Sequence, residues 1–282
     1  MKNNSDIRAA VSGIMRLTLC LAFFAAMTSC QDVVKKGLDV VSNKAIASLD
    51  GFDYTDSEKL GPVVTRDVEV STLTSLATAG ANKIIFKQDS LSSLKLTGNE
   101  KMIDKYEVMV ENGELIVRLT DDRGNYNSNT PRMTISVSGP SLEEVMLEGI
   151  VDFEVEGNIV QEAPMNVYIS GVGKFEADEI TCGSFDLSLS GIANAEIDKI
   201  VSKGNSGIDI KGTGSVEGSI DCVDLRLKTE GTGSMDLDVN CEYLRTFNTG
   251  IGNITLRGSC YKLVDSSSKS SIMDTSELEI EN

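Results

Sequence analysis

Apolar and polar residues alternate along most of the chain after residue 62, and from residue 145 the alternation repeats with a period of about 20 residues. Each copy is centred on a glycine, as in I-S-G-V-G-K-F-E-A from Ile169 and T-E-G-T-G-S-M-D-L from Thr229. These pivot glycines are spaced 22, 20, 21, 19 and 19 residues apart, and they are Gly149, Gly171, Gly191, Gly212, Gly231 and Gly250. A nearly constant period of this kind is typical of a solenoid, in which each copy forms one turn.

The residues four and two positions before each pivot glycine, and four and six positions after it, are mostly apolar. In the copy at Gly171 they are Val167, Ile169, Phe175 and Ala177. Because the side chains of a strand alternate between its two faces, these positions point inward and those between them face solvent. The pattern therefore predicts an all-β chain: a right-handed parallel β-helix or closely related β-solenoid over residues 63–282. A pivot glycine suits a corner that needs a positive φ or a close backbone approach.

The chain before the array shows the same β pattern in a less regular form. Residues 75–86 fit the later copies with Gly80 as the pivot, and a tight hairpin turn is predicted at 111–114. Three further stretches alternate as strands: 94–98, 106–110 and 115–119. The polar residues 121–131 predict an exposed loop. Helices and strands do not alternate anywhere after residue 62, which argues against an α/β enzyme fold.

The N-terminus predicts a secretion signal and a lipid anchor. A basic start is followed by an apolar run from Leu17 to Ala26 and then by M-T-S-C, which ends at Cys30. The M-T-S-C stretch resembles the lipobox of bacterial lipoproteins, and the resemblance implies that residues 1–29 are removed and that Cys30 carries the lipid, palmitate included. An ordinary cleaved signal with an incidental cysteine is the alternative. Residues 30–62 then form a tether and N-terminal cap, with apolar residues at helical spacings between 33 and 49.

The amino-acid composition limits the reactions and the partners that can be expected of this protein. The chain has 43 acidic and 26 basic residues, a formal net charge of −17, and neither histidine nor tryptophan. Such a negative field repels phosphates, which argues against nucleic acid as a partner. The lack of histidine removes the commonest general base and the commonest neutral metal ligand, and no cofactor is expected.

Several stretches resemble one known family. They are V-T-R-D-V-E-V from Val64, L-A-T-A-G-A-N-K-I-I-F from Leu76, V-E-N-G-E-L-I-V from Val110 and G-I-G-N from Gly250. Together they are similar to the head GIN domain family, which is common among Bacteroidetes lipoproteins and carries an auto-transporter adhesin label inferred from fold. The resemblance covers about residues 63–282 and implies no catalytic residues.

One solvent-facing column of the array is acidic. Five residues after successive pivots stand Glu154, Glu176, Glu196, Glu217 and Asp236. In a parallel stack these carboxylates lie about 4.8 Å apart along one face. They could serve as a solubility device that keeps the β surface from aggregating. They could also bind Ca²⁺ weakly or form a catalytic acid cluster. Because the acids recur with the period, whereas an active site breaks a repeat at one place, the solubility interpretation is favoured.

Four cysteines of the mature chain occupy one repeat position, and they are Cys182, Cys222, Cys241 and Cys260. A shared position predicts a stacked ladder at a corner of the solenoid. Three interpretations stay open: buried free thiols, one or two disulfides, and a metal site. The parallel Cβ vectors of stacked residues oppose good disulfide geometry, and a straight ladder does not supply the converging ligands that tetrahedral zinc needs.

These observations predict a lipid-anchored, extracytoplasmic β-solenoid protein in the envelope of a diderm bacterium. It would be an outer-membrane lipoprotein, periplasmic or surface-facing, and a non-enzymatic adhesin-like or binding module. A structural envelope protein without a ligand and a carbohydrate-active β-helix enzyme are the alternatives. The expected partners are the membrane, through the lipid on Cys30, and a host or envelope glycan or protein. Arg123 and Tyr126, in the polar loop, are the candidate ligand contacts.

Overall fold

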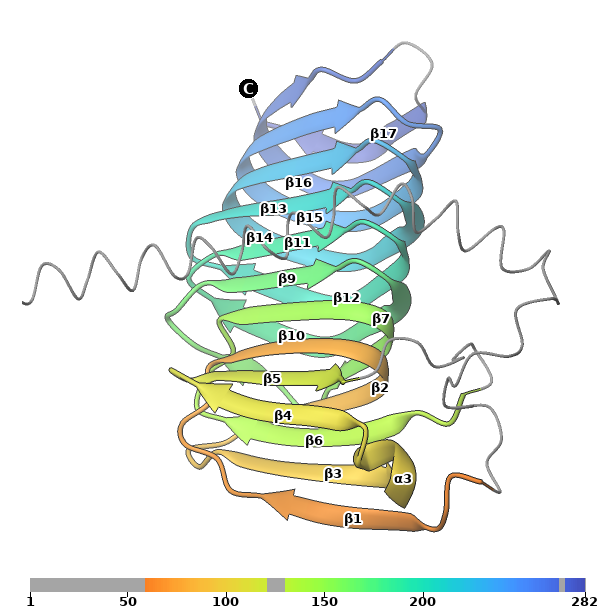
Figure 1. The fold of residues 1–282 in the computed structure, drawn as a ribbon. Helices are drawn as coiled ribbons and strands as arrows, with labels where there is room; N and C mark the ends of the chain where they lie inside the picture. The colour runs from red at the N-terminus through yellow and green to blue at the C-terminus, as the bar shows by residue number, and fades with distance from the viewer. Residues whose placement is uncertain (1–58, 121–129, 269–271, 282) are drawn as a thin grey trace, which may run out of the picture. The chain divides into compact units, whose positions relative to one another are not determined.

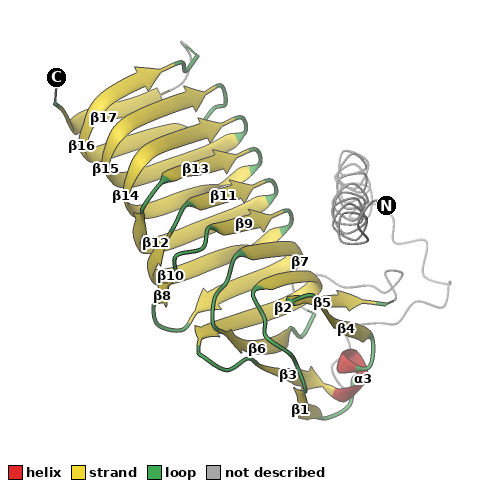
Figure 2. Cartoon of the chain, turned by 90° about the vertical axis from the view of Figure 1, so that its left-hand side faces the viewer, coloured by secondary structure: helices red, strands yellow, loops and turns green. Residues whose placement is uncertain are grey.

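The computed structural model describes residues 59–120, 130–268 and 272–281. They form a parallel β-solenoid of about seven turns, which confirms the predicted fold class (Figure 1). Figure 2 shows the successive strands stacked side by side along the solenoid axis. The strands of the regular array are β7 (Glu144–Val155), β8 (Ile159–Val160), β9 (Met165–Ile169), β10 (Val172–Cys182), β11 (Phe185–Leu189), β12 (Ile192–Ser202), β13 (Asn205–Ile210), β14 (Thr213–Thr229), β15 (Thr232–Asn248), β16 (Asn253–Asp265) and β17 (Ile272–Ile280).

The pivot glycines lie directly above one another along the stack. A Cβ built on any pivot from Gly149 to Gly250 would lie only 1.9–2.3 Å from the carbonyl oxygen of the pivot one turn earlier. Only glycine permits this approach of two backbones. Among the pivots, φ is positive at Gly80 (127°) and Gly149 (99°). Close approach is therefore the reason for glycine along the whole column, and the expected positive φ holds only at its start.

The inward columns form the core as the alternation predicts. Of the four aligned positions around the six array pivots, all are buried except Gly218, which is half-buried. Phe153 and Phe175, on successive turns, are fully buried, and their rings stack with centroids 5.2 Å apart and an interplanar angle of 9°. Each turn thus buries its apolar side chains against the next, and no turn is complete alone.

In the first turns of the solenoid, the strands that lie next to one another in space are not consecutive in the sequence. The elements here are β1 (Val63–Val68), β2 (Ser75–Gln88), β3 (Ser93–Asn99), α3 (Glu100–Ile103), β4 (Tyr106–Glu111), β5 (Glu114–Leu119) and β6 (Met133–Gly139). The strand β2 pairs with β7 in parallel, with Gly80 opposite Gly149, so the early copy of the repeat is confirmed. On its other side, β2 pairs with β5 and then with β6, which together form one turn.

An antiparallel layer closes the N-terminal end of the stack, where Figure 1 draws β3 and β1 beyond β6. The strand β3 pairs with β6, and β1 pairs with β3, both antiparallel. The short helix α3, which the sequence pattern does not predict, buries Met102 and Ile103 against this end. The predicted hairpin between β4 and β5 is confirmed, with Asn112 and Gly113 at positive φ. These elements cover what would otherwise be an open sheet edge.

Several predicted features lie outside the described residues. They are the signal peptide, the lipidation site Cys30, the helical spacings at 33–49, and most of the 121–131 loop with Arg123 and Tyr126. Within the part of the chain that the structure describes, no helix is long and apolar enough to cross a membrane.

Candidate functional site

The predicted acidic column is present as a ladder on one face of the solenoid. In the parallel register, Glu176 of β10 lies between Glu154 of β7 and Glu196 of β12. Glu217 of β14 and Asp236 of β15 continue the same line. All five candidate carboxylates therefore lie in one column, as the sequence period predicts.

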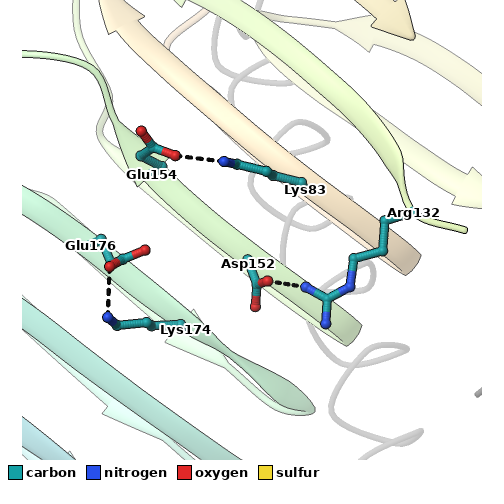
Figure 3. A network of polar contacts seen from close by, with 6 residues as sticks. All are labelled: Lys83, Arg132, Asp152, Glu154, Lys174 and Glu176. Atoms are coloured by element: carbon teal, nitrogen blue, oxygen red, sulfur yellow. Dashed lines mark hydrogen bonds and ion pairs between the residues drawn. The ribbon is translucent and has the colours of Figure 1, made fainter. Parts of the chain in front are cut away.

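Basic side chains compensate this acid ladder, as Figure 3 shows for its first turns. The Nζ atom of Lys83 lies 2.8 Å from Glu154, and that of Lys174 lies 2.6 Å from Glu176 and 2.7 Å from Glu196. Arg257 pairs with Asp236 at the other end. Hydrogen bonds to Glu176 and Glu196 raise the pKa of Lys174 above its usual range. Four of the five ladder carboxylates are thus ion-paired rather than bare, namely Glu154, Glu176, Glu196 and Asp236.

The chemistry of the ladder agrees with an architectural role. No three acidic or cysteine side chains of the described residues are grouped so that they could hold a metal ion. The weak Ca²⁺ site therefore stays a prediction. In Figure 3 two of the ion pairs, Lys83 with Glu154 and Arg132 with Asp152, join different turns. Lys174 pairs with Glu176 of its own strand and also with Glu196 of the next strand, so these contacts help to tie neighbouring strands together.

The described strands on either side of the polar loop end at the corner where other turns carry a pivot glycine. The strand β5 pairs with β2 up to Arg118, opposite Ala79, and β6 resumes the pairing at Met133, opposite Asn82. The break between β5 and β6 therefore falls at the level of Gly80. Arg123 and Tyr126 belong to the sequence between these two strands and lie outside the described residues.

The four cysteines form the predicted ladder and are free thiols. Cys241 pairs in register with Cys222 on one side and Cys260 on the other. Cys182 lies opposite Ser202, so a serine follows Cys182 in the column on the next turn. Burial raises the pKa of the Cys182 thiol to about 11 and, together with nearby Asp224 and Asp221, that of Cys222 to about 12. An activated nucleophile needs the opposite shift, so these thiols do not resemble catalytic cysteines.

A groove of about 700 Å³ runs along the stack beside this ladder. We call it the corner groove, and its wall includes Cys222, Val223, Cys241, Tyr243, Cys260 and Tyr261. Tyr243 is 39% exposed, Tyr261 is 58% exposed and Val223 is 39% exposed. Exposed aromatic and apolar side chains gathered in a concave surface are typical of a ligand-binding region.

A smaller polar pocket of about 180 Å³ adjoins the corner groove. We call it the Gly207 pocket, and it is lined by Asp186, Asn205, Ser206, Asp224, Arg226 and Arg245. The Arg245 guanidinium pairs with both carboxylate oxygens of Asp224 and lies 6.0 Å from the centre of the Tyr243 ring. Burial raises the pKa of Asp186, and Arg226 opposes this shift. Since Asp224 pairs in register with Tyr243, the pocket and the groove form one surface across neighbouring turns.

The sequence does contain a signal for this pocket, although the repeat pattern alone does not draw attention to it. Ser206 occupies an inward column in which neighbouring turns carry Phe185 and Leu225. Gly207 occupies an outward column between Asp186 and Arg226. Two adjacent positions therefore lose side-chain volume in one turn only, and this interruption opens the pocket.

Comparisons with known proteins agree with this architecture. The fold defines the chain as a parallel β-solenoid that presents rigid side surfaces. Residues 72–219 match the family model described as "Putative auto-transporter adhesin, head GIN domain", and the chain belongs to that family. Membership supports a binding module. Among curated proteins, none has a sequence that matches this chain.

Three solved structures share the fold at low sequence identity. A "putative adhesin" from Parabacteroides distasonis ATCC 8503 is 14% identical, with a TM-score of 0.58, over 76% of this chain and 97% of that one. A "putative adhesin" from Bacteroides fragilis NCTC 9343 is 18% identical, with a TM-score of 0.52, over 69% of this chain and 97% of that one. A "Putative lipid binding protein" from Parabacteroides distasonis ATCC 8503 is 17% identical, with a TM-score of 0.54, over 76% and 96% of the two chains. None of these descriptions is that of an enzyme.

Proposed function

We propose that the chain is a lipid-anchored binding module of the bacterial cell envelope, adhesin-like in function and without enzymatic activity. The corner groove carries this proposal. It exposes Tyr243, Tyr261 and Val223 together, whereas much of the remaining outer surface carries ion pairs such as those of the acid ladder. Its floor is a stack of strands, so the contact surface is rigid before a ligand arrives, and less ordering entropy opposes binding. The family description supports the adhesin-like part of the proposal.

The anchor in this proposal is the lipid on Cys30, which the lipobox-like M-T-S-C stretch supports. Several acyl chains on one residue hold a protein at a membrane stably, whereas one chain does not. Cells that make the Cys30→Ala chain should incorporate no labelled palmitate into it and should lose it from the membrane fraction. Retention of both the label and the membrane location would contradict the anchor.

Attachment of intact cells tests the binding function. Cells that display the full-length chain should adhere to immobilised mucin or fibronectin more strongly than cells that lack it. The double substitution Tyr243→Ser with Tyr261→Ser should remove this difference. Tyr168→Ser is the matched control, because Tyr168 is 40% exposed but lies outside the groove.

The control variant should attach like the unaltered chain. Attachment that survives the double substitution would remove the corner groove from the proposal. A chain that confers no attachment and is resistant to protease on intact cells would instead favour a structural envelope protein that faces the periplasm.

A further inference from the structure

The Gly207 pocket is the place where the repeat is interrupted on both faces of one strand. A Cβ on Gly207 would lie 2.5 Å from Oδ1 of Asp186 and 2.9 Å from Nη2 of Arg226. These two side chains, from the turns on either side, therefore converge over the space that the missing side chain leaves. Ser206, next to it, is small where Phe185 and Leu225 stand on the neighbouring turns.

The two converging groups have unused hydrogen-bonding capacity. Within the described residues, neither the Asp186 carboxylate nor the Arg226 guanidinium takes part in a hydrogen bond or an ion pair at contact distance, although Arg226 acts on Asp186 electrostatically. A carboxylate offers several acceptor sites, and a guanidinium offers five N–H donors in a fixed fork. A ligand that donates to Asp186 and accepts from Arg226 would satisfy both.

The charges of the pocket favour a ligand without net charge. Two aspartates, Asp186 and Asp224, face two arginines, Arg226 and Arg245. An anion would meet the two carboxylates and the net charge of −17, and a cation would meet the two guanidinium groups. Adjacent hydroxyl groups, which donate and accept at neighbouring positions, match such a mixed lining without adding charge.

The neighbouring groove indicates that the ligand is longer than one ring. Arg245 links the two regions, because it pairs with Asp224 in the pocket and lies over the ring of Tyr243 in the groove. An exposed tyrosine ring offers an apolar face for the C–H side of a sugar ring and a hydroxyl for hydrogen bonding. A small zwitterion would also match Asp186 and Arg226, but it would leave the tyrosines of the groove without a role.

We propose that the Gly207 pocket binds one uncharged sugar residue of an oligosaccharide that continues into the corner groove. This inference rests on the proposed binding function and specifies its ligand class. Asp186, Asn205 and Arg226 hydrogen-bond the sugar hydroxyls, while Tyr243 packs against the next ring. The exposed, open form of the site suits an internal or terminal segment of a longer glycan.

The test uses the full-length chain in detergent and a printed array of neutral gluco-, galacto-, manno- and N-acetylglucosamine oligosaccharides, with uronate-containing and sulfated oligosaccharides beside them. We expect binding to at least one neutral oligosaccharide. Arg226→Ala and Gly207→Ala should each weaken it by about tenfold or more, as expected when the principal contacts of a polar site are lost. Arg257→Ala, which removes an arginine from the acid ladder, is the control and should bind normally.

Melting temperatures of the variants show whether each one is folded, and Gly207→Ala adds only one carbon against the ends of two flexible side chains. Binding only to acidic glycans, neutral binding that both pocket variants retain, or no binding to any neutral oligosaccharide would each overturn the inference. If cells still attach through Tyr243 and Tyr261 in that last case, the proposed function stands and only the ligand class is wrong. If attachment is absent as well, both fail.

Discussion

Gly212 lies so close to Gly191 that a Cβ on Gly212 would be 2.0 Å from the Gly191 carbonyl oxygen. The contact is with backbone, which cannot rotate away as a side chain does. Gly212→Ala should therefore force the two turns apart and lower the free energy of unfolding by about 3 kcal/mol or more. Chemical denaturation of the two proteins measures the change.

Gly207→Ala is the matched control for this prediction. Its Cβ would meet only the ends of Asp186 and Arg226, which are free to move. We expect a change in the free energy of unfolding within about 0.5 kcal/mol. Equal losses in the two variants would contradict the view that backbone contact along the pivot column requires glycine.

Lys174 should stabilise the solenoid in a salt-dependent way. It bridges Glu176 and Glu196, so Lys174→Ala leaves two carboxylates of adjacent strands unneutralised. The variant should melt at a lower temperature than the unaltered protein in low salt, and the difference should shrink near 1 M salt, where the screening length is only about 3 Å. Lys203→Ala is the control, because Lys203 pairs with Glu162 alone. An equal and salt-independent effect of both substitutions would contradict the bridging role.

The repeat period was sufficient to predict most of the array. Once the pivots are aligned, strand alternation assigns each position to the core or the surface, and register places Glu154 beside Glu176 and Cys222 beside Cys241. The N-terminal turns could not be predicted in this way. Their order depends on β5 and β6 forming one turn against β2, which is a pairing between distant segments that no local pattern specifies.

Asp186 should make stability depend on pH. Burial raises the pKa of Asp186 above its ordinary value of 3.8, so the folded state holds this proton more tightly than the unfolded state does. The free energy of unfolding should therefore fall as pH rises through the window just above 3.8, and the penalty should persist at neutral pH. Asp186→Asn removes the carboxylate and its desolvation penalty.

Melting temperatures of the unliganded proteins across pH test this prediction. The Asn variant should melt at or above the temperature of the unaltered protein at pH 7, and its advantage should disappear below pH 3.8. Asp198→Asn, on an exposed part of another face, is the control. A variant that is less stable at pH 7 but not at low pH would show that the Asp186 carboxylate stabilises the fold, contrary to the account.

Cys222 should react slowly in the folded protein. A pKa raised from 9.0 to about 12 lowers the thiolate fraction at pH 8 by about 1,000-fold, which a more nucleophilic thiolate offsets only in part. Iodoacetamide labelling followed by mass spectrometry should therefore be at least about tenfold slower in native protein than in urea. Rapid native labelling, or a Cys222–Cys241 disulfide in protein isolated without reductant, would contradict the free-thiol ladder.

The candidate ligand surface was harder to predict than the fold, for a physical reason. The period draws attention to residues that recur, such as the acids from Glu154 to Asp236, but recurring contacts mainly hold neighbouring turns together. The Gly207 pocket arises because positions 206 and 207 carry a serine and a glycine where the neighbouring turns carry larger side chains. Its lining also comes from four turns, so only the register brings Asp186 and Arg226 over the same space.

Attachment of intact cells, measured side by side for two sets of substitutions, tests whether the repeated acid ladder only holds the solenoid together while the corner groove binds. One variant carries Glu196→Gln with Glu217→Gln in the acid ladder, and the other carries Tyr243→Ser with Tyr261→Ser in the corner groove. We expect the ladder variant to attach to immobilised mucin or fibronectin as the unaltered chain does, and the groove variant to lose attachment. Loss in the ladder variant, with attachment retained in the groove variant, would contradict this expectation.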